Sequence, residues 1–307
     1  MKFVITGATS FIGLELTRYL LEHKHTVVAV CRPNSKGTVA IPEGVEIVTS
    51  EMCDYGELHN KISSADVFIN LAWSGTGHDG RNVADIQNEN IAYTIDGMHS
   101  AKKIGCKLFL EAGSQAEYGS TTAPQKEDSV CNPFSEYGKA KLKVKDELFA
   151  LSEKLGIKYI HLRIFSIFGE NDHPWTLVMS AIDKMLKNEP LELSPCTQNW
   201  NFLYVKDAAR IITLLCENAV KEPTFKHEIY NVASNDTRVL KNFVERIKIL
   251  ANSSSKLNYG AIIPENLVSL QPDLTNTIQT SRFEDFHGFD YVIKAIINNK
   301  RKLMQHD

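Results

Sequence analysis

The sequence predicts an α/β fold: a doubly wound parallel sheet with a smaller, mixed C-terminal lobe. Two observations predict it. Short β-rich runs alternate with helical runs through the first half of the chain, with short connections between them. The β-rich runs are nearly continuous in apolar residues, as expected for strands covered on both faces. A chain of 307 residues is long enough to bury a sizeable core.

The expected elements follow in order. Strands are expected at 2–7, 26–32, 45–49, 66–72, 106–113 and 158–165, and helices at 11–25, 90–105 and 135–155. After about Phe168 the alternation loosens, and proline, asparagine and aromatic residues come at irregular spacing. A strand and an amphipathic helix at 202–219 then return the chain to the first domain.

Composition excludes several classes of protein. The net charge of −3 gives no electrostatic reason to expect nucleic acid or an anionic membrane as a partner. No apolar run approaches the ~18 residues of a spanning helix, and the N-terminus lacks the features of a signal peptide. The cysteines form no CxxC and have no histidine at ligand spacing, which indicates reduced thiols and no metal site. We expect a cytoplasmic protein.

A glycine-rich turn, ITGATSFIG, joins the first strand to the first helix. Backbone N–H groups and a helix N-terminus in this position can bind a pyrophosphate. Gly7 allows the tight turn and Gly13 allows close helix–sheet packing, while Ser10 replaces the usual middle glycine. We therefore expect a dinucleotide-binding domain at 1–166 and about 202–230. The substrate-binding lobe is expected at about 167–201 and 231–307.

The end of the second strand bears on the choice of cofactor. NAD sites commonly place an acidic residue there, but this chain has Cys31 followed by Arg32. An arginine suits a ribose 2′-phosphate, so NADP(H) is favoured over NAD(H). Asp54 is a candidate contact to the adenine, or alternatively the cap of the helix that follows.

Tyr137 and Lys141 are four residues apart on the helix at 135–155, which places them on one face. That face continues with Val144 and Leu148, so the lysine lies on the stripe expected to be buried, where it needs a partner. An ammonium group near a tyrosine lowers the tyrosine pKa and makes it useful as an acid or base. The alternative is a lysine that reaches water from the first turn.

Four features occur in order: TGxxxxIG, NLA at 70–72, a serine after the strand at 106–113, and Tyr-x-x-x-Lys. On these the chain resembles the extended short-chain dehydrogenase/reductases, specifically the NAD(P)-dependent epimerase/dehydratase family acting on nucleotide sugars. The resemblance runs from about Lys2 to Asn231 and implies a Rossmann-like sheet. It also implies that Tyr137 is the catalytic acid/base, that Lys141 holds the nicotinamide ribose, and that Ser114 hydrogen-bonds the reacting oxygen.

The resemblance also implies a set of cofactor contacts and a homodimer. The dimer would form through the helices that carry Asn90 and Tyr137. The expected cofactor contacts are Gly7, Thr9, Ser10, Phe11, Ile12, Gly13, Arg32, Asp54, Leu71, Ala72, Trp73, Asn90, Tyr137, Lys141 and Phe165.

The stretch EAGSQAEYGS narrows the reaction. By the resemblance, dehydratases of this family carry a Thr-Asp-Glu motif where this chain has Ser114, Gln115 and Ala116. Glu117 comes one place late, and on an extended segment it would point the other way. By the same resemblance, enzymes that epimerise two carbons before reduction carry a Ser-Cys motif, with the cysteine at the position of Ala116. Both reactions are therefore disfavoured.

We expect NADPH-dependent reduction of the 4-keto group of a nucleotide-linked 4-keto-6-deoxyhexose, because a reductase consumes a soluble reductant and Arg32 favours NADPH. The alternatives are an NAD-dependent nucleotide-sugar 4-epimerase and a reductase of a non-nucleotide carbonyl compound. A non-catalytic NADP-binding regulator is a further alternative, against which the intact Ser114, Tyr137 and Lys141 argue.

The substrate side departs from the family pattern. By the resemblance, members of this family commonly carry an arginine that contacts the diphosphate, and this chain has Trp200 at that position. Ser166 likewise stands where the family usually has an asparagine. Trp175 and Trp200 are expected either to stack on a base or sugar or to fill the core of the lobe. The expected substrate contacts are Ser114, Ser166, Trp175, Gln198 and Trp200, with Gln198, Arg210, Arg238 or Arg282 replacing the missing arginine.

Overall fold

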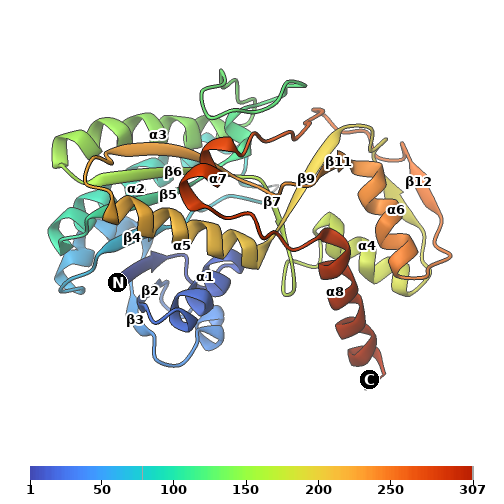
Figure 1. The fold of residues 1–307 in the computed structure, drawn as a ribbon, viewed down its shortest axis with the longest axis horizontal. Helices are drawn as coiled ribbons and strands as arrows, with labels where there is room; N and C mark the ends of the chain where they lie inside the picture. The colour runs from blue at the N-terminus through green and yellow to red at the C-terminus, as the bar shows by residue number, and fades with distance from the viewer. Residues whose placement is uncertain (78, 306–307) are drawn as a thin grey trace.

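The computed structural model describes residues 1–77 and 79–305. Its main sheet has seven parallel strands in the order β10-β6-β5-β4-β1-β2-β3 (Figure 1). They are β1 (Lys2–Thr6), β2 (Thr26–Cys31), β3 (Glu46–Thr49), β4 (Val67–Asn70), β5 (Leu108–Ser114), β6 (Lys158–Ile164) and β10 (His227–Val232). The predicted doubly wound sheet is confirmed. Strand order reverses between β1 and β4, which is where such sheets bind ligands.

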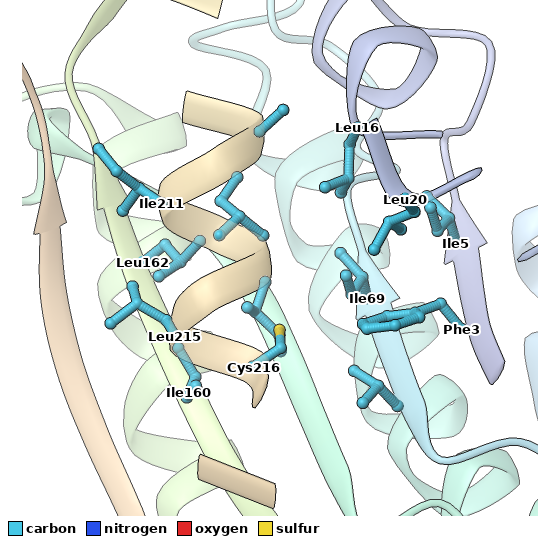
Figure 2. Close-up of a cluster of buried hydrophobic side chains, with 14 of the residues drawn as sticks. Phe3, Ile5, Leu16, Leu20, Ile69, Ile160, Leu162, Ile211, Leu215 and Cys216 are labelled. Carbon is cyan, nitrogen blue, oxygen red and sulfur yellow. The ribbon is translucent and has the colours of Figure 1, made fainter. Parts of the chain in front are cut away.

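Helices cover both faces of this sheet. One face carries α1 (Phe11–Glu22) and α5 (Val205–Lys221), and the other carries α2 (Ala84–Ile104) and α3 (Glu136–Leu155). Strand β1 shows why its residues are apolar throughout: Phe3 and Ile5 pack toward α1 and α5, and Val4 packs toward α2 and α3. Figure 2 shows the first of these cores, with side chains of α5 facing β6 and side chains of α1 beside β1 and β4.

The smaller lobe contains α4 (Leu177–Leu186), α6 (Leu240–Leu250) and α8 (Phe289–Met304), which lie together at one side of the molecule (Figure 1). One small sheet has the order β11-β9-β7 and the other pairs β12 with β8. Their strands are β7 (Ser166–Phe168), β8 (Leu191–Leu193), β9 (Asn199–Tyr204), β11 (Thr237–Val239) and β12 (Leu257–Tyr259). An aromatic core of Phe168, Phe202, Phe243 and Phe289 joins the lobe's elements.

Several boundaries differ from expectation. The strand expected from 202 is β9, which belongs to the small sheet and runs directly into α5, with Tyr204 as the N-cap residue. Helix α2 begins at Ala84 rather than at 90. The remaining elements are α7 (Thr275–Ser281), which packs on α5 and β10, and three 3₁₀ helices, η1 (Lys36–Ala40), η2 (Met52–Asn60) and η3 (Gln115–Glu117). Among the described helices, none is long and apolar enough to cross a membrane.

Candidate active site

The glycine-rich turn between β1 and α1 has the geometry that the sequence predicts. Gly7 has φ = +67°, and a Cβ there would lie 2.8 Å from the backbone nitrogen of Ala72. A Cβ on Gly13 would collide with the carbonyl oxygen of Gly7. Ser10 is the N-cap of α1, and its hydroxyl oxygen accepts the N–H of Gly13 at 3.1 Å. The turn therefore has room for a close approach only because both positions are glycine.

The loop after β4 lies beside this turn and is held in place by Asn90. The Asn90 amide bonds both the N–H and the carbonyl of Ser74, at 2.8 and 3.0 Å, and also the carbonyl of Ile86. Asn90 is completely buried. Its side chain thus fixes the course of the loop that carries Leu71, Ala72 and Trp73.

A hollow of about 540 Å³ lies at the end of β2. Arg32 lines it together with Ser35, Lys36 and Thr9. Lys36 is a second cation at this point that the sequence reasoning did not select, although it follows Arg32 by four residues. Asp54 lies in the first turn of η2, exposed, and outside the lining of this hollow.

Ser114 ends β5 and caps the short helix η3. Its hydroxyl oxygen accepts the N–H of Ala116 at 3.1 Å, and the carboxylate of Glu117 accepts the N–H of Ser114 at 2.8 Å. The expectation that the stretch continues extended is therefore wrong, because this capping box turns the chain into a 3₁₀ helix. Glu117 still cannot serve as a proton carrier for a substrate, since it is fully buried and engaged.

Glu117 is the centre of a buried charged cluster. One carboxylate oxygen lies 2.9 Å from Nε2 of His161 and the other accepts the Nε–H of Arg163 at 2.8 Å, both from β6. Burial raises the pKa of the Glu117 carboxyl, but His161 and then Arg163 outweigh that effect and hold the pKa at about 2. The Glu117 carboxylate thus stays charged, and its bonds to β6 and to the Ser114 N–H fix the turn that carries Ser114.

Tyr118 directly follows this turn but is not placed for acid–base chemistry. Its hydroxyl donates to the side-chain oxygen of Asn231 at 2.7 Å, and the guanidinium of Arg163 lies over its ring. Burial raises the pKa of Tyr118 well above its ordinary value. Tyr118 is therefore a structural residue, and Tyr137 remains the candidate proton carrier.

Lys141 is buried, as the helical stripe predicts, and its partner is Glu111 of β5. The ammonium nitrogen lies 2.8 Å from Oε1 of Glu111 and 2.6 Å from the carbonyl oxygen of Ala112. The other Glu111 oxygen accepts the Asn70 amide at 2.6 Å, and Asn70 in turn accepts the hydroxyl of Thr6. The alternative of a solvent-reaching lysine is therefore wrong.

Trp73 covers Lys141 on the side away from the sheet. The Lys141 nitrogen is 3.4 Å from the centroid of the indole ring, and the indole N–H donates to Gln87 at 2.8 Å. The Tyr137 ring meets Trp73 edge-on at 6.2 Å, and the Arg81 guanidinium lies 4.2 Å from the Tyr137 centroid. The loop after β4, the start of α2 and the start of α3 thus meet around the side chains of Trp73 and Tyr137.

The expected substrate contacts fall into two groups. Trp200 packs in a cluster with Tyr118 and Phe165, and its indole nitrogen is buried without a partner among the described residues. The side-chain carbonyl oxygen of Gln198 is likewise buried without a partner among the described residues. Ser166 is the first residue of β7, which pairs with β9. Trp175 lies apart from this cluster, 74% exposed and stacked on His173, so it is not a core residue.

The four residues expected to replace the missing arginine are also divided. Arg238 of β11 pairs in register with Trp200 and is held by Asp236 through two hydrogen bonds. Arg210 and Arg282 line a separate hollow beside Tyr19 on the α1–α5 face. Of the arginines, only Arg238 thus lies beside the tryptophan that stands in the family's arginine position.

Sequence reasoning missed Glu111 and Arg81, and it considered Glu117 only as a proton carrier. Glu111 had a detectable signal: it is a charge inside an apolar run predicted to be covered on both faces, and Lys141 was a buried charge of opposite sign. Arg81 had none, because it lies in a loop far from Tyr137 in sequence.

The chain is similar to known proteins over most of its length. The family model described as the NAD dependent epimerase/dehydratase family matches residues 3–233. CDP-abequose synthase of Salmonella muenchen is 24% identical over 276 residues, covering 85% of this chain and 84% of the relative. dTDP-6-deoxy-L-talose 4-dehydrogenase (NAD(+)) of Aggregatibacter actinomycetemcomitans is 24% identical over 268 residues, covering 85% and 94%.

The fold is also that of a solved structure. UDP-glucose 4-epimerase of Thermotoga maritima superposes with a TM-score of 0.88 at 18% identity, covering 99% of this chain and 100% of the other.

Proposed function

Because the chain belongs to the NAD dependent epimerase/dehydratase family, we propose that it uses NADPH to reduce the 4-keto group of a nucleotide-linked 4-keto-6-deoxyhexose. The observation that carries this proposal is the Ser114 turn. Gln115 and Ala116 provide no carboxylate or thiol beside Ser114. The carboxylate of Glu117 is already bonded to His161 and Arg163. Chemistry that needs a second proton carrier has no group for it at this turn.

The proposed roles follow from the hydrogen bonds. Ser114 accepts a backbone N–H with its hydroxyl oxygen, so its own proton is available to the substrate carbonyl oxygen. Tyr137 gives its proton to that same oxygen and takes one back from solvent. When bound, the nicotinamide supplies the hydride that the sugar carbon accepts. One hydride and one proton convert the carbonyl to an alcohol.

Two features support NADPH as the reductant. The Gly7 turn packs against the backbone of Leu71 and Ala72 and leads into the N-terminus of α1, which suits a pyrophosphate. Arg32 and Lys36 share the hollow at the end of β2 with a single carboxylate, Glu51, and two cations suit a 2′-phosphate. The 4-dehydrogenase relative is named for NAD(+), so cofactor choice needs its own test. We expect Arg32→Asp to shift preference toward NADH in steady-state kinetics, and an unchanged NADPH/NADH ratio would overturn the assignment.

On the substrate side, we propose that Trp200 and Gln198 contact the nucleotide sugar. Each has a buried polar atom without a partner among the described residues, and such atoms commonly bind a ligand or water. We also propose a homodimer through α2 and α3, which pack against each other on one face of the sheet. Light scattering of the purified protein tests the dimer, and a species of one chain's mass would refute it.

The decisive experiment is mass spectrometry of the enzyme with NADPH and a panel of nucleotide-linked 4-keto-6-deoxyhexoses. A gain of two hydrogens, matched by oxidation of NADPH, is the expected result. Interconversion of 4-hydroxy sugars without net cofactor turnover would instead identify a 4-epimerase. Absence of any nucleoside diphosphate binding in isothermal titration would favour a simpler carbonyl substrate. Tyr137→Phe is the control, and we expect it to abolish turnover while sparing NADPH binding.

A further inference from the structure

A second hollow, of about 830 Å³, lies on the α1–α5 face of the molecule. Helices α1, α5 and α7 (Figure 1) contribute most of its lining, together with Tyr230 of β10. The three candidate catalytic residues, all within the described part of the chain, do not line it. Arg210 and Arg282 do line it, so two cations that the sequence indicated as substrate contacts lie outside the candidate active site.

Arg282 combines a left-handed backbone with an unpaired side chain. It is the C-cap residue of α7 with φ = +56°, a conformation that glycine adopts at little cost and arginine adopts rarely. Arg282 is exposed, and within residues 1–77 and 79–305 its side chain forms no hydrogen bond or ion pair. A free guanidinium thus lines the hollow at a position where backbone conformation alone favours glycine.

Arg210 is held beside the same hollow by its stacking on Phe283. Its guanidinium carbon lies 4.9 Å from the centre of the Phe283 ring, which is buried. Its ion-pair partner Asp285 lies 3.7 Å away and is 91% exposed, so water and salt screen that pair. The Asn218 amide donates to the Thr280 carbonyl at 2.7 Å and fixes α5 against the end of α7. The two helices that carry the arginines are therefore joined at the hollow.

The other charged groups in the lining leave an excess of positive charge. Lys221 is a third cation, and it pairs with Glu217 at 3.4 Å. Glu222 is the single carboxylate of the lining among the described residues, and one of its oxygens already accepts the N–H and the hydroxyl of Thr224. Three cations and one engaged carboxylate suit a ligand that carries a phosphate.

Aromatic rings provide the rest of what a ligand needs. Tyr19 of α1, Phe225 and Tyr230 all line the hollow. A guanidinium binds a phosphate through two parallel N–H donors, and aromatic faces stack with nucleobases. We propose that this hollow is a second ligand site, which binds a mononucleotide with its phosphate at Arg210 and Arg282 and its base against the rings.

The test is isothermal titration of adenosine 5′-monophosphate into the protein with the nicotinamide cofactor at saturation, so that the cofactor site is filled. We expect a binding event whose affinity falls about tenfold in Arg210→Gln and in Arg282→Gly, because each variant loses charged hydrogen bonds to the phosphate. Arg18→Gln, a surface arginine of α1 paired with Glu15, is the matched control and leaves the affinity unchanged. Inorganic phosphate is titrated in parallel, and we expect it to bind more weakly than the nucleotide.

The Arg282→Gly variant also separates binding from folding. Glycine relieves the left-handed backbone at this position, so we expect a thermal unfolding midpoint no lower than that of the unmodified chain. Unchanged affinity in both arginine variants would overturn the proposal. Inorganic phosphate binding as tightly as the nucleotide would overturn it in favour of a site for free phosphate. An affinity that falls in Gln198→Ala but not in the arginine variants would place the nucleotide at the proposed substrate contacts and would also overturn it. Because neither arginine takes part in the proposed reduction, such results leave that reaction standing.

Discussion

Glu111 and Glu117 lie on the same stretch of chain and are both fully buried, yet they are neutralised differently. Glu111 meets a lysine on a flexible four-carbon stem that comes from a helix and also touches Trp73. Glu117 meets His161 and Arg163 on the adjacent strand and the backbone of its own turn. The two carboxylates therefore show two different roles for a buried charge in this protein. The first pair joins a helix to the sheet beside Trp73, whereas the second cluster holds a turn against the neighbouring strand.

The largest expected effect is on stability. We expect Glu117→Leu to lower the free energy of unfolding by about 3–5 kcal/mol, because Arg163 stays buried without its carboxylate. Urea unfolding measures the effect, with the exposed Glu147→Leu on α3 as control. A loss no larger than that of the control would show that the two acidic positions do not differ as we describe.

Acid should weaken the Glu117 cluster in a defined pH window. The folded pKa of about 2 lies below the ordinary value of 4.5, so this carboxylate stabilises the fold fully above that value. The stabilisation, about 3 kcal/mol from the difference in pKa, is lost as the pH falls from 4.5 toward 2. Unfolding curves across this range should fall less steeply for Glu117→Gln than for the unmodified chain. Parallel curves would contradict the assignment.

The smallest effect should come from the other carboxylate. We expect Glu111→Leu to cost about 1.5–3 kcal/mol, the range for a hydrogen bond to a charged group. Lys141 keeps the Ala112 carbonyl and the Trp73 ring as partners. Unfolded side by side with Glu117→Leu, this variant should be the more stable of the two. The reverse order would break the distinction between the pair that joins a helix to the sheet and the cluster that holds a turn.

The sequence predicted most of the dinucleotide-binding half because its signals are local. Gly7 and Gly13 lie in one short turn, and Tyr137 and Lys141 lie on one helical turn, so spacing alone brings them together. Ser10 shows the same locality, since its hydroxyl caps the helix that it begins.

The remainder depends on contacts between distant parts of the chain. Arg81 reaches Tyr137 from a loop, and Glu117 meets strand β6 across more than forty residues. The turn at Ser114 has a local signal in the Ser-x-x-Glu spacing of its capping box, but the partners of Glu117 on β6 have none. In the smaller lobe, Trp200 faces Arg238 only through the pairing of β9 with β11.

The direct junction of β9 with α5 has a mechanical consequence. Closing motions need a few residues whose backbone angles can change, and none lies between this strand and this helix, since Tyr204 is both the last residue of β9 and the N-cap residue of α5. We therefore expect a displacement of Trp200, near one end of β9, to be transmitted to α5, which lies against the seven-stranded sheet. Strand and helix are thus expected to move together, so that a ligand that displaces the small sheet also shifts the packing of α5 on β6.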